Sequence, residues 1–512
     1  WLSDDPAWAI EITCEDGALA GNVRAKHAGL GIELIFKDIV FNERPIFLRR
    51  VVVRNLVERS RDIKLYFAHQ FEIYKSHGGD TAYFDPTEHA MIHYKGRRVF
   101  LINALLNGEP FHDYAAGRAN FQGQEGSHRD ADDGVLSRNP VEHGPADSVI
   151  GLYGLYGGGQ ERVCDYWLAA SQSIADAIAL NQYIIKKTPD HLIDATSEFW
   201  RSWLSRKQKV LGLPEPLKKL YERSLMYVRA HVDYEGGIIA SLDSDMLQHG
   251  LDTYTYVWPR DAAFASLAMS EAGEISVAKR FLEFCHSVVS SEGYFMHKYL
   301  PDKALGSSWH PWIKDGKAQL PIQEDETALV LIAVKDYYDK SRDLEFLGSL
   351  YVDLVEKPAN FMLQYREPNT KLPQPSYDLW EEKRGISTYT ACAVVRALEC
   401  AAQLSIVLGK SAEAKKYTTA SEEMKKSILT YLWDDKEGMF VKMLNRVDDK
   451  EEYETIYDRT IDMSSLYGVF TFGVLPATDA RLSRAFEGAV RRLGYGIRAG
   501  GFARYEGDTY YK

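Results

Sequence analysis

Hydrophobic positions follow two different patterns along the chain, and the pattern changes near residue 180. Before that point, apolar and polar residues alternate in short segments, as in the Ile-Lys-Leu-Tyr run at 63–66, and turn residues such as the glycines at 157–159 separate the segments. Alternation with a period of two is typical of strands with one buried face. We therefore predict a large antiparallel β-sandwich, with strands at residues 8–13, 31–37, 46–54, 63–74, 90–94, 99–104, 148–153 and 163–170.

One long passage, residues 107–147, does not fit this pattern. It is polar, contains six glycines and has few aliphatic residues. Long stretches of this composition between regular elements are uncommon and often cover a surface or a site. We interpret the passage as an extended loop.

From residue 195 onward the spacing of apolar residues becomes helical. Residues 195–209 carry Phe199, Trp200, Trp203 and Leu204, which predicts a linker helix between two halves. After the Leu-Pro-Glu-Pro segment at 213–216 the chain is almost wholly helical. The predicted domains are therefore a β-sandwich at 1–190, a linker at 191–212 and a helical domain at 213–512, with helices at 216–231, 261–272, 275–290, 325–338, 344–365, 388–408, 412–433, 462–472 and 480–493.

Two of these helices are apolar nearly all round, at residues 328–334 and 391–402, whereas neighbours such as 412–433 have a charged face. A helix without a polar face must be surrounded by other elements. Alternating inner and outer helices indicate concentric rings, as in a toroidal helical barrel. In such a ring the long loops gather at one end and carry function, which directs attention to the loops at 250–260, 293–323 and 367–387.

The charge of the chain argues against a nucleic-acid partner. Sixty-one Lys and Arg residues stand against 73 Asp and Glu residues, for a net charge of −12, and nucleic-acid binding depends on clustered cations. Aromatic residues make up 12 %, including 31 Tyr and 10 Trp. This suits a carbohydrate site, where rings pack on sugar faces, although a Tyr-rich β domain would also produce it.

The five cysteines are scattered and odd in number, without metal-ligand spacing, which favours a reducing compartment without a disulfide framework. We find no signal peptide and no apolar run close to the roughly 20 residues that span a bilayer. We therefore expect a cytoplasmic protein without a membrane partner. Because the chain starts at Trp1 rather than at a methionine, this expectation applies only to the residues given.

The strongest candidate for chemistry is the segment 375–385, Pro-Ser-Tyr-Asp-Leu-Trp-Glu-Glu-Lys-Arg-Gly. An adjacent carboxylate and an apolar wall both raise the pKa of a carboxyl group, which is what a proton donor near neutral pH needs. Trp380 and Tyr377 are candidates for the wall and for a sugar-stacking face beside Glu381 and Glu382. The alternative is a solvated helix end with local charge pairing.

Two other loops carry candidate residues. Arg260 and Asp261 follow Pro259 at a helix start, either as a functional pair or as an ordinary cap with a structural ion pair. Asp325 and Thr327 suit the cap of a buried helix. His310 is expected to be a hydrogen-bonding pocket residue, because no second His or Cys stands at ligand spacing. We predict no metal and no cofactor, and no compact carboxylate loop argues for calcium.

Taken together, the motifs of these loops resemble those of glycoside hydrolase family 15, the glucoamylase family, over nearly the whole chain. The N-terminal half, with Asp80-Thr-Ala-Tyr-Phe-Asp-Pro and His93-Tyr-Lys, is similar to the β-supersandwich domain of prokaryotic members. The motifs of the second half are Tyr254-x-Tyr-x-Trp258-Pro-Arg260-Asp261, Ser-Trp309-His310, Gln323-Glu-Asp-Glu-Thr-Ala, Asp378-Leu-Trp380-Glu381-Glu382 and Arg504-Tyr505-x-x-Asp508-Thr-Tyr510-Tyr511.

The resemblance implies an (α/α)6 barrel and an inverting exo-hydrolase that releases glucose from the non-reducing ends of α-glucans or maltooligosaccharides. It implies that Glu381 is the general acid and Glu382 a neighbouring substrate-binding carboxylate. Further implied substrate contacts are Arg260 and Asp261 at the terminal glucose, Tyr254, Trp258 and Trp380 as aromatic walls, Trp309 at the next sugar, and Arg504 at a further sugar.

In the family the general base lies in a Pro-Glu segment that would follow Tyr510 and Tyr511. Because the chain stops at Lys512 and we expect nine helices where six hairpins need twelve, we expect a truncated barrel with its base beyond Lys512. The linkage stays open between α-1,4-glucans, isomalto-linked glucans (glucodextranase) and trehalose (trehalase). An inverting disaccharide phosphorylase and a non-catalytic glycan-binding protein are further alternatives, and the oligomeric state is not predicted.

Overall fold

The computed structural model describes residues 1–512 except 3, 77, 208–211, 243–252, 315, 450–451, 495–499 and 510–512. The chain divides into two compact units, Trp1–Met226 and Tyr227–Lys512, and the boundary falls within helix α3 (Glu215–Ala230). The segment expected as a linker helix forms α2 (Pro189–Ser205), which belongs to the first unit.

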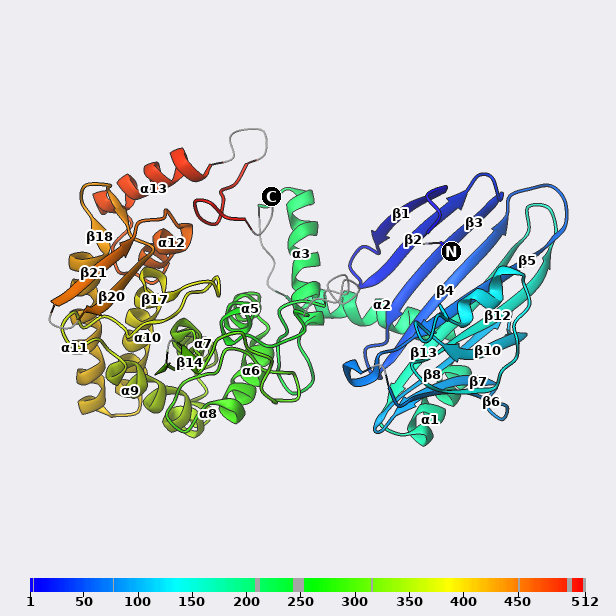
Figure 1. The fold of residues 1–512 in the computed structure, drawn as a ribbon, viewed down its shortest axis with the longest axis horizontal. Helices are drawn as coiled ribbons and strands as arrows, with labels where there is room; N and C mark the ends of the chain where they lie inside the picture. The colour runs from blue at the N-terminus through cyan, green and yellow to red at the C-terminus, as the bar shows by residue number, and fades with distance from the viewer. Residues whose placement is uncertain are drawn as a thin grey trace. The chain divides into compact units, whose positions relative to one another are not determined.

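The first unit is an antiparallel β-sandwich with two helices on one side (Figure 1). Its larger sheet has the strand order β1-β2-β3-β4-β13-β8-β7-β6-β11, with β9 paired to β8, and its smaller sheet has the order β10-β12-β5. The strands are β1 (Trp8–Cys14), β2 (Ala20–His27), β3 (Ile32–Val40), β4 (Ile46–Asn55), β5 (Arg61–Gln70), β6 (Asp80–Asp85), β7 (Ala90–Lys95), β8 (Arg98–Leu106), β9 (Glu109–Pro110), β10 (Asp113–Arg118), β11 (Val141–Gly144), β12 (Ala146–Tyr156) and β13 (Glu161–Ser171).

The alternation along β4 shows how the larger sheet is used on both faces. Val51 and Val53 lie in the core between the two sheets. Ile46 and Leu48 point to the opposite face, where they pack with α1 (Ile174–Lys187) and α2. Because successive side chains of a strand point to opposite faces, one strand supports two cores, and the predicted sandwich is confirmed.

The prediction of an extended loop at 107–147 is wrong in part. The passage contains β9, β10, β11 and a 3-10 turn at Ser127–Asp132, and β10 is a strand of the smaller sheet. Its small residues hid the strand from a search for β-branched and aromatic positions, yet Ala115 and Ala116 are buried. Leu136 does cover a face of this sheet, where it packs on Ala115 and Val149.

The second unit is built mainly from helices in a barrel-like arrangement (Figure 1). The apolar segments at 328–334 and 391–402 are buried as expected, in α7 and α10. Helices α5, α7, α10 and α12 pack on one another in this order, while α6 packs on α5 and α7, α11 on α10 and α13 on α12. The bounds are α5 (Pro259–Glu271), α6 (Ile275–Val288), α7 (Glu324–Ser341), α8 (Leu344–Leu350), α9 (Lys357–Gln364), α10 (Thr388–Val407), α11 (Ser411–Ser427), α12 (Met463–Thr471) and α13 (Ala480–Leu493).

The helix predicted at 344–365 is divided into α8, a π-helical segment at Tyr351–Glu356 and α9. Pro358 occupies the first turn of α9. Proline lacks the N–H that an α-helix would use at this position, and a wide turn before it accommodates the missing hydrogen bond. A second π-helical segment, Ile428–Leu432, ends the helix predicted at 412–433.

Helix α10 corrects the expectation that no segment has the length and composition of a membrane span. Its 20 residues reach a mean hydropathy of 1.4, but 72 % of that window is buried inside the protein. A helix buried on all sides in a globular core has the same composition as a membrane helix. Its apolar residues are therefore accounted for by packing within the second unit.

A four-stranded sheet in the order β16-β17-β20-β21 lies among the helices and was not predicted. Its strands are β16 (Ser376–Tyr377), β17 (Arg384–Ser387), β20 (Met443–Asp449) and β21 (Glu452–Asp458). Shorter pairs are β14 (Ile313–Lys314) with β15 (Lys317–Ala318) and β18 (Trp433–Asp434) with β19 (Met439–Phe440). The turn between β16 and β17 is the segment singled out for chemistry.

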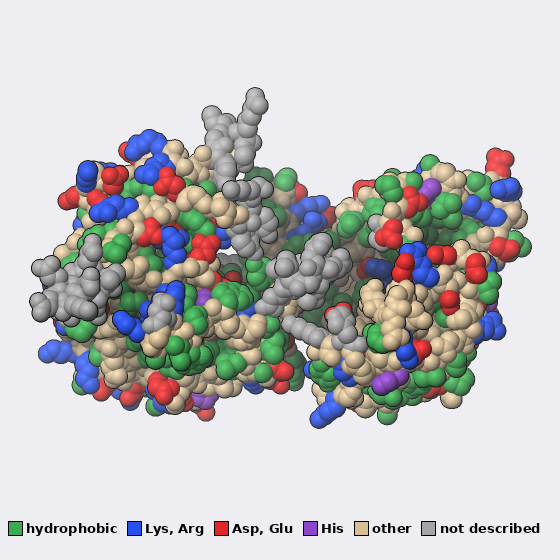
Figure 2. Space-filling model, in the orientation of Figure 1, with side chains coloured by type: hydrophobic (Ala, Val, Ile, Leu, Met, Phe, Trp, Pro, Cys, Tyr) green, Lys and Arg blue, Asp and Glu red, His purple; other side chains and the backbone are tan. Residues whose placement is uncertain are grey.

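Basic and acidic side chains are interspersed on the face shown in Figure 2. No broad basic patch covers the described residues on that face, which agrees with the excess of acidic residues in the chain.

Candidate active site

The second unit has a cavity of about 500 Å³, and nine of the site residues named from the sequence line it, whereas Tyr377 and His310 do not. Their chain positions span 250 residues, so the fold brings together three loops and the C-terminal segment. Ala240 and Leu379 complete the lining, which otherwise consists of Tyr254, Trp258, Arg260, Asp261, Trp309, Trp380, Glu381, Glu382 and Arg504.

The first loop ends at α5, and the helix start directs its two charged residues differently. Trp258 is the N-cap residue and Pro259 takes the first helical position, where its missing N–H costs nothing. Arg260 is 8 % exposed, whereas the side chain of Asp261 is 47 % exposed. Both residues line the cavity, Arg260 with a buried side chain and Asp261 with a half-exposed one.

Four carboxyl groups surround the guanidinium of Arg260. Its nitrogens lie 3.4 Å from Asp261, 3.5 Å from Asp325, 3.8 Å from Glu326 and 3.6 Å from Glu381, and it also donates to the side-chain oxygen of Gln323. Burial alone would lower the pKa of Arg260, but these carboxylates raise it. The guanidinium therefore stays charged in a fixed orientation.

Asp325 or Thr327 was expected to cap the helix α7, and this interpretation is wrong for both, since Thr327 accepts instead from the N–H of Phe295. No side chain caps α7, and Asp325 faces Arg260 instead. Burial raises the pKa of Asp325 to about 6 although Arg260 lowers it, and burial raises the pKa of Glu326 well above its ordinary value. One arginine cannot neutralise four carboxylates, so we infer that Glu326 holds its proton.

The backbone of Glu381 adopts an unusual conformation in the turn between β16 and β17. Its φ is +64°, in the left-handed region that costs energy for residues other than glycine. The turn is held by Asp378, whose carbonyl accepts from the N–H of Glu381 at 2.9 Å and whose side chain accepts from the N–H groups of Glu382 and Lys383. The backbone thus directs the Glu381 side chain into the cavity.

The pKa of Glu381 is shifted in the direction opposite to our expectation. Burial raises it, but His297 at 3.2 Å and Arg260 at 3.6 Å favour the carboxylate and together lower the pKa below its ordinary value. The predicted aromatic wall is not what decides the shift. Tyr377 stacks on His310 at 3.8 Å, and the cations around Glu381 outweigh its burial.

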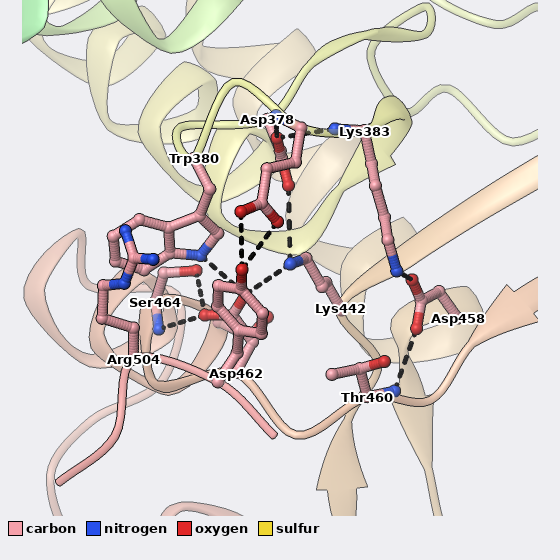
Figure 3. A network of polar contacts seen from close by, with 12 residues as sticks. Asp378, Trp380, Lys383, Lys442, Asp458, Thr460, Asp462, Ser464 and Arg504 are labelled. Atoms are coloured by element: carbon pink, nitrogen blue, oxygen red, sulfur yellow. Dashed lines mark hydrogen bonds and ion pairs between the residues drawn. The ribbon is translucent and has the colours of Figure 1, made fainter. Parts of the chain in front are cut away.

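Glu382 is held by a network that reaches three other segments (Figure 3). The hydroxyl of Tyr505 donates to Glu382, and Lys442 lies 4.0 Å above the Tyr505 ring. Lys442, 2 % exposed, lies 3.5 Å from Asp378 and 3.3 Å from Asp462. A buried cation between two buried carboxylates fixes the segments that carry them.

The aromatic residues of the cavity are also fixed from behind. The indole N–H of Trp380 donates to Asp462 at 2.8 Å, and Arg504 lies 4.8 Å over the ring of Trp380 (Figure 3). Arg504 is oriented in turn by two bonds of 2.7 Å to Asp508. These contacts hold Trp380 in a single orientation at the rim.

Lys298 lies against three aromatic rings, of which those of Trp258 and Trp309 line the cavity. Its ammonium group is 3.8 Å from the ring of Trp309, 4.7 Å from that of Trp258 and 4.3 Å from that of Tyr256. Trp309 is 49 % exposed, so one ring face remains available to a ligand. Tyr254 meets Trp258 edge to face.

A family model for glycosyl hydrolases family 15 matches residues 215–512. The chain belongs to this family. An uncharacterized glycosyl hydrolase of Methanocaldococcus jannaschii is 24 % identical to this family 15 chain. The matched region covers 94 % of this chain and 72 % of that protein. This chain is 23 % identical to Trehalase 2 of Sulfolobus acidocaldarius over 73 % of its length and 65 % of that protein, and 26 % identical to a glucoamylase of a Clostridium species over 52 % of its length and 35 % of that protein.

Among solved structures, a bacterial glucoamylase complexed with acarbose has a similar fold, with a TM-score of 0.78 and 18 % identity over 99 % of this chain and 73 % of that one. A putative kojibiose phosphorylase from the human microbiome gives a TM-score of 0.51 and 10 % identity over 85 % of this chain and 59 % of that one. These likenesses confirm the fold of a β-sandwich followed by a helical barrel for this family 15 member.

Sequence reasoning missed several residues of this family 15 site. His297 contacts Glu381 from within the loop at 293–323, and Lys442, the residue before β20, holds the turn. The sequence feature that could have pointed to them is a histidine or lysine within a mainly apolar or aromatic stretch. This feature alone does not identify a site residue, because it does not show which side chains the fold brings close. Tyr510 and Tyr511, quoted in the last motif, lie outside the described residues.

Among the residues that the structure describes, no group of three or more His, Cys, Asp and Glu side chains has the arrangement of a metal site. His310 accepts from or donates to the Gln323 side chain at 3.0 Å and is buried behind the cavity, as predicted for a hydrogen-bonded pocket residue.

Proposed function

We propose that this family 15 protein is an exo-acting glycoside hydrolase that releases glucose, with inversion, from the non-reducing ends of α-glucans or maltooligosaccharides. The observation that carries the proposal is the convergence of Glu381, Glu382 and the Arg260–Asp261 pair on one cavity with aromatic walls. The names of the Clostridium glucoamylase and of the glucoamylase bound to acarbose support the substrate class.

In this proposal the terminal sugar binds against Arg260 and Asp261. The charged guanidinium donates to hydroxyl oxygens and the half-exposed carboxylate of Asp261 accepts from hydroxyl groups. Charge-assisted hydrogen bonds in a fixed geometry are strong and directional. Trp309 and Trp380 then limit the positions of the sugar rings by packing on their faces.

Glu381 acts as the general acid. It donates its proton to the glycosidic oxygen as that bond breaks and positive charge develops on the sugar ring. An inverting enzyme also needs a second carboxylate about 6.5–9.5 Å away to activate water on the opposite face. That general base is expected beyond Lys512, which stays a prediction.

Trehalose is the second candidate substrate, and the relative named Trehalase 2 favours it. A trehalase would use the same acid and the same grip on the terminal glucose. The choice between the two would then depend on the space around the leaving sugar, where Trp309 and Arg504 line the cavity.

The test is to incubate the full-length protein with maltooligosaccharides, isomalto-linked glucans and trehalose, and to follow the products by NMR. We expect β-glucose from one of these substrates, independent of phosphate. A phosphate-dependent release of glucose 1-phosphate would contradict hydrolysis and favour the phosphorylase. Binding of all three without any product would instead favour a glycan-binding protein.

A further inference from the structure

The imidazole ring of His297 lies between Glu381 and three polar or aromatic neighbours. Its Nε2 is 3.2 Å from Glu381 Oε2 and also 3.2 Å from the indole nitrogen of Trp258. Its Nδ1 is 2.9 Å from the hydroxyl oxygen of Ser308. The His297 side chain is 1 % exposed, so these groups replace water around both ring nitrogens.

The donors and acceptors at Nε2 allow two arrangements. The indole N–H of Trp258 can only donate, so Nε2 accepts from it when the ring proton is on Nδ1, directed at Ser308. A favourable contact with Glu381 then requires a protonated carboxyl group, which shares the single lone pair of Nε2 with the indole N–H. When Nε2 carries the ring proton, it donates to the Glu381 carboxylate, and Nδ1 accepts from Ser308.

The ring cannot easily turn to another orientation. It stacks on His310 with centroids 4.1 Å apart and meets Trp309 edge to face at 4.9 Å. Close packing of planar groups on two sides holds a side chain in one rotamer. Both nitrogens of His297 therefore stay beside the same groups, and Nε2 accepts from the Trp258 indole only when it does not donate to the Glu381 carboxylate.

The charges around the pair favour a neutral ring. Glu381 raises the pKa of His297, but burial, Lys298 and Arg260 lower it, and the net shift is downward. His310 is also held neutral, since burial lowers its pKa to about 3. The acidic neighbour Glu326 has a raised pKa. A neutral imidazole is the form that can exchange donor and acceptor roles.

We propose that His297 is a positioning residue for Glu381. It donates a hydrogen bond to the carboxylate form of Glu381 and accepts one from the acid form. The carboxyl group therefore keeps one orientation in both protonation states. The inference rests on the proposed role of Glu381 as the general acid. An acid that loses its proton in each turnover must regain it without moving, and displacements of about 1 Å can reduce rates roughly 100-fold.

Two substitutions separate hydrogen bonding from packing in the full-length protein. His297→Phe keeps a stacked ring and removes both nitrogens, whereas His297→Gln keeps a side-chain donor and acceptor and removes the ring. The matched control is His93→Phe, which changes a histidine that is also 1 % exposed but lies in the β-sandwich unit. Glu381→Gln serves as the reference for complete loss of the acid.

The measurement is kcat and KM on the best natural substrate and on α-glucosyl fluoride, whose leaving group needs little protonation. We expect His297→Phe to lower kcat on the natural substrate about 10- to 100-fold, with little change in KM or in fluoride hydrolysis. We expect His297→Gln to retain most of the activity. The basic limb of kcat/KM should move to higher pH in His297→Phe, because the carboxylate loses a donor.

An equal loss on both substrates in His297→Phe with an unmoved basic limb would overturn the inference, as would a larger loss in His297→Gln than in His297→Phe. If His297→Phe does not fold, the rate and limb of His297→Gln decide, since retained activity requires the hydrogen bond.

A Glu381→Gln variant with wild-type rates on both substrates would remove the proposed function itself, and the inference with it. A selective loss in Glu381→Gln without one in His297→Phe would overturn the inference alone.

Discussion

The hydroxyl of Tyr505 lies 2.6 Å from one carboxylate oxygen of Glu382 and 2.8 Å from the other. The two residues are 123 positions apart in the chain. A donor centred between both oxygens fixes the plane of the carboxylate as well as its position. Glu382 is thereby presented to the cavity in a defined orientation.

Removal of this hydroxyl should weaken substrate binding. In Tyr505→Phe we expect KM to rise roughly tenfold, because a hydrogen bond to a charged group contributes about 1.5–3 kcal/mol and Glu382 becomes free to rotate. The matched control is Tyr365→Phe, which loses a hydrogen bond to the carbonyl of Pro375 outside the cavity lining. Calorimetric titration with a glucose-like inhibitor that shows equal affinity in both variants would contradict the role of Tyr505.

Lys442 and Lys383 provide a direct comparison of a buried with an exposed cation (Figure 3). Lys442→Met should lower the free energy of unfolding by about 3–5 kcal/mol, because Asp378 and Asp462 stay buried without their cation. Lys383→Met removes only a half-exposed pair with Asp458 and should cost below about 1 kcal/mol. Denaturant unfolding of the two variants measures the difference, and similar values would argue against the buried network as a determinant of stability.

The acid role of Glu381 predicts an effect on turnover rather than on binding. Glu381→Gln should lower kcat about 100- to 10,000-fold and leave the affinity for a glucose-like inhibitor within a few-fold of wild type, because the acid acts mainly in the transition state. Steady-state kinetics of the full-length protein check this. Unchanged turnover would exclude Glu381 from the role.

Arg260 and Asp261 should respond differently to substitution although they are neighbours. Asp261→Asn should weaken inhibitor binding roughly tenfold with little change in stability, since Asp261 is half exposed. Arg260→Ala should weaken binding and also lower the melting temperature, because the Asp325 carboxylate is left buried without its cation. Calorimetry combined with thermal unfolding distinguishes the two, and a fully stable Arg260→Ala would show that Asp325 is neutral without Arg260.

The lowered pKa of Glu381 predicts activity at acidic pH. The general acid must be protonated, so kcat/KM should fall about tenfold per pH unit above the pKa of Glu381 in the free protein. Because His297 and Arg260 hold this pKa below the ordinary value of 4.5, the decline should already be present between pH 5 and 7. A pH profile that is flat over this range would contradict the electrostatics of the free site.

The two hydrophobic periods were sufficient to predict the sandwich, eight of its strands and the nine helical segments expected after residue 213. The period of the pattern depends only on local geometry, so residues such as Val51 and Val53 fall on their expected face. Strands β2, β6, β10 and β11, helix α1, and the sheet formed by β16, β17, β20 and β21 were missed. The segments of β10 and of this sheet are short, polar or rich in small residues, and such segments become strands only through the partners that the fold gives them.

In the site, too, features set by neighbouring residues in the sequence were predicted, whereas features set by contacts between distant residues were not. Motifs were enough to name nine residues of one cavity, because each motif is a contiguous segment. The direction of the Glu381 pKa shift was wrong, since it depends on Arg260 and His297, which are 121 and 84 positions away in the sequence. Neither contact leaves a signal in the residues next to Glu381.

The left-handed backbone at Glu381 places this position under two separate demands. Asparagine or glycine would suit a φ of +64° better than glutamate, so variants with these residues would relieve local strain while removing the carboxyl group. The glutamate at position 381 therefore lowers the thermal stability of the protein relative to asparagine or glycine at the same position. Consensus or stability-guided redesign would tend to replace the one side chain on which turnover is proposed to depend.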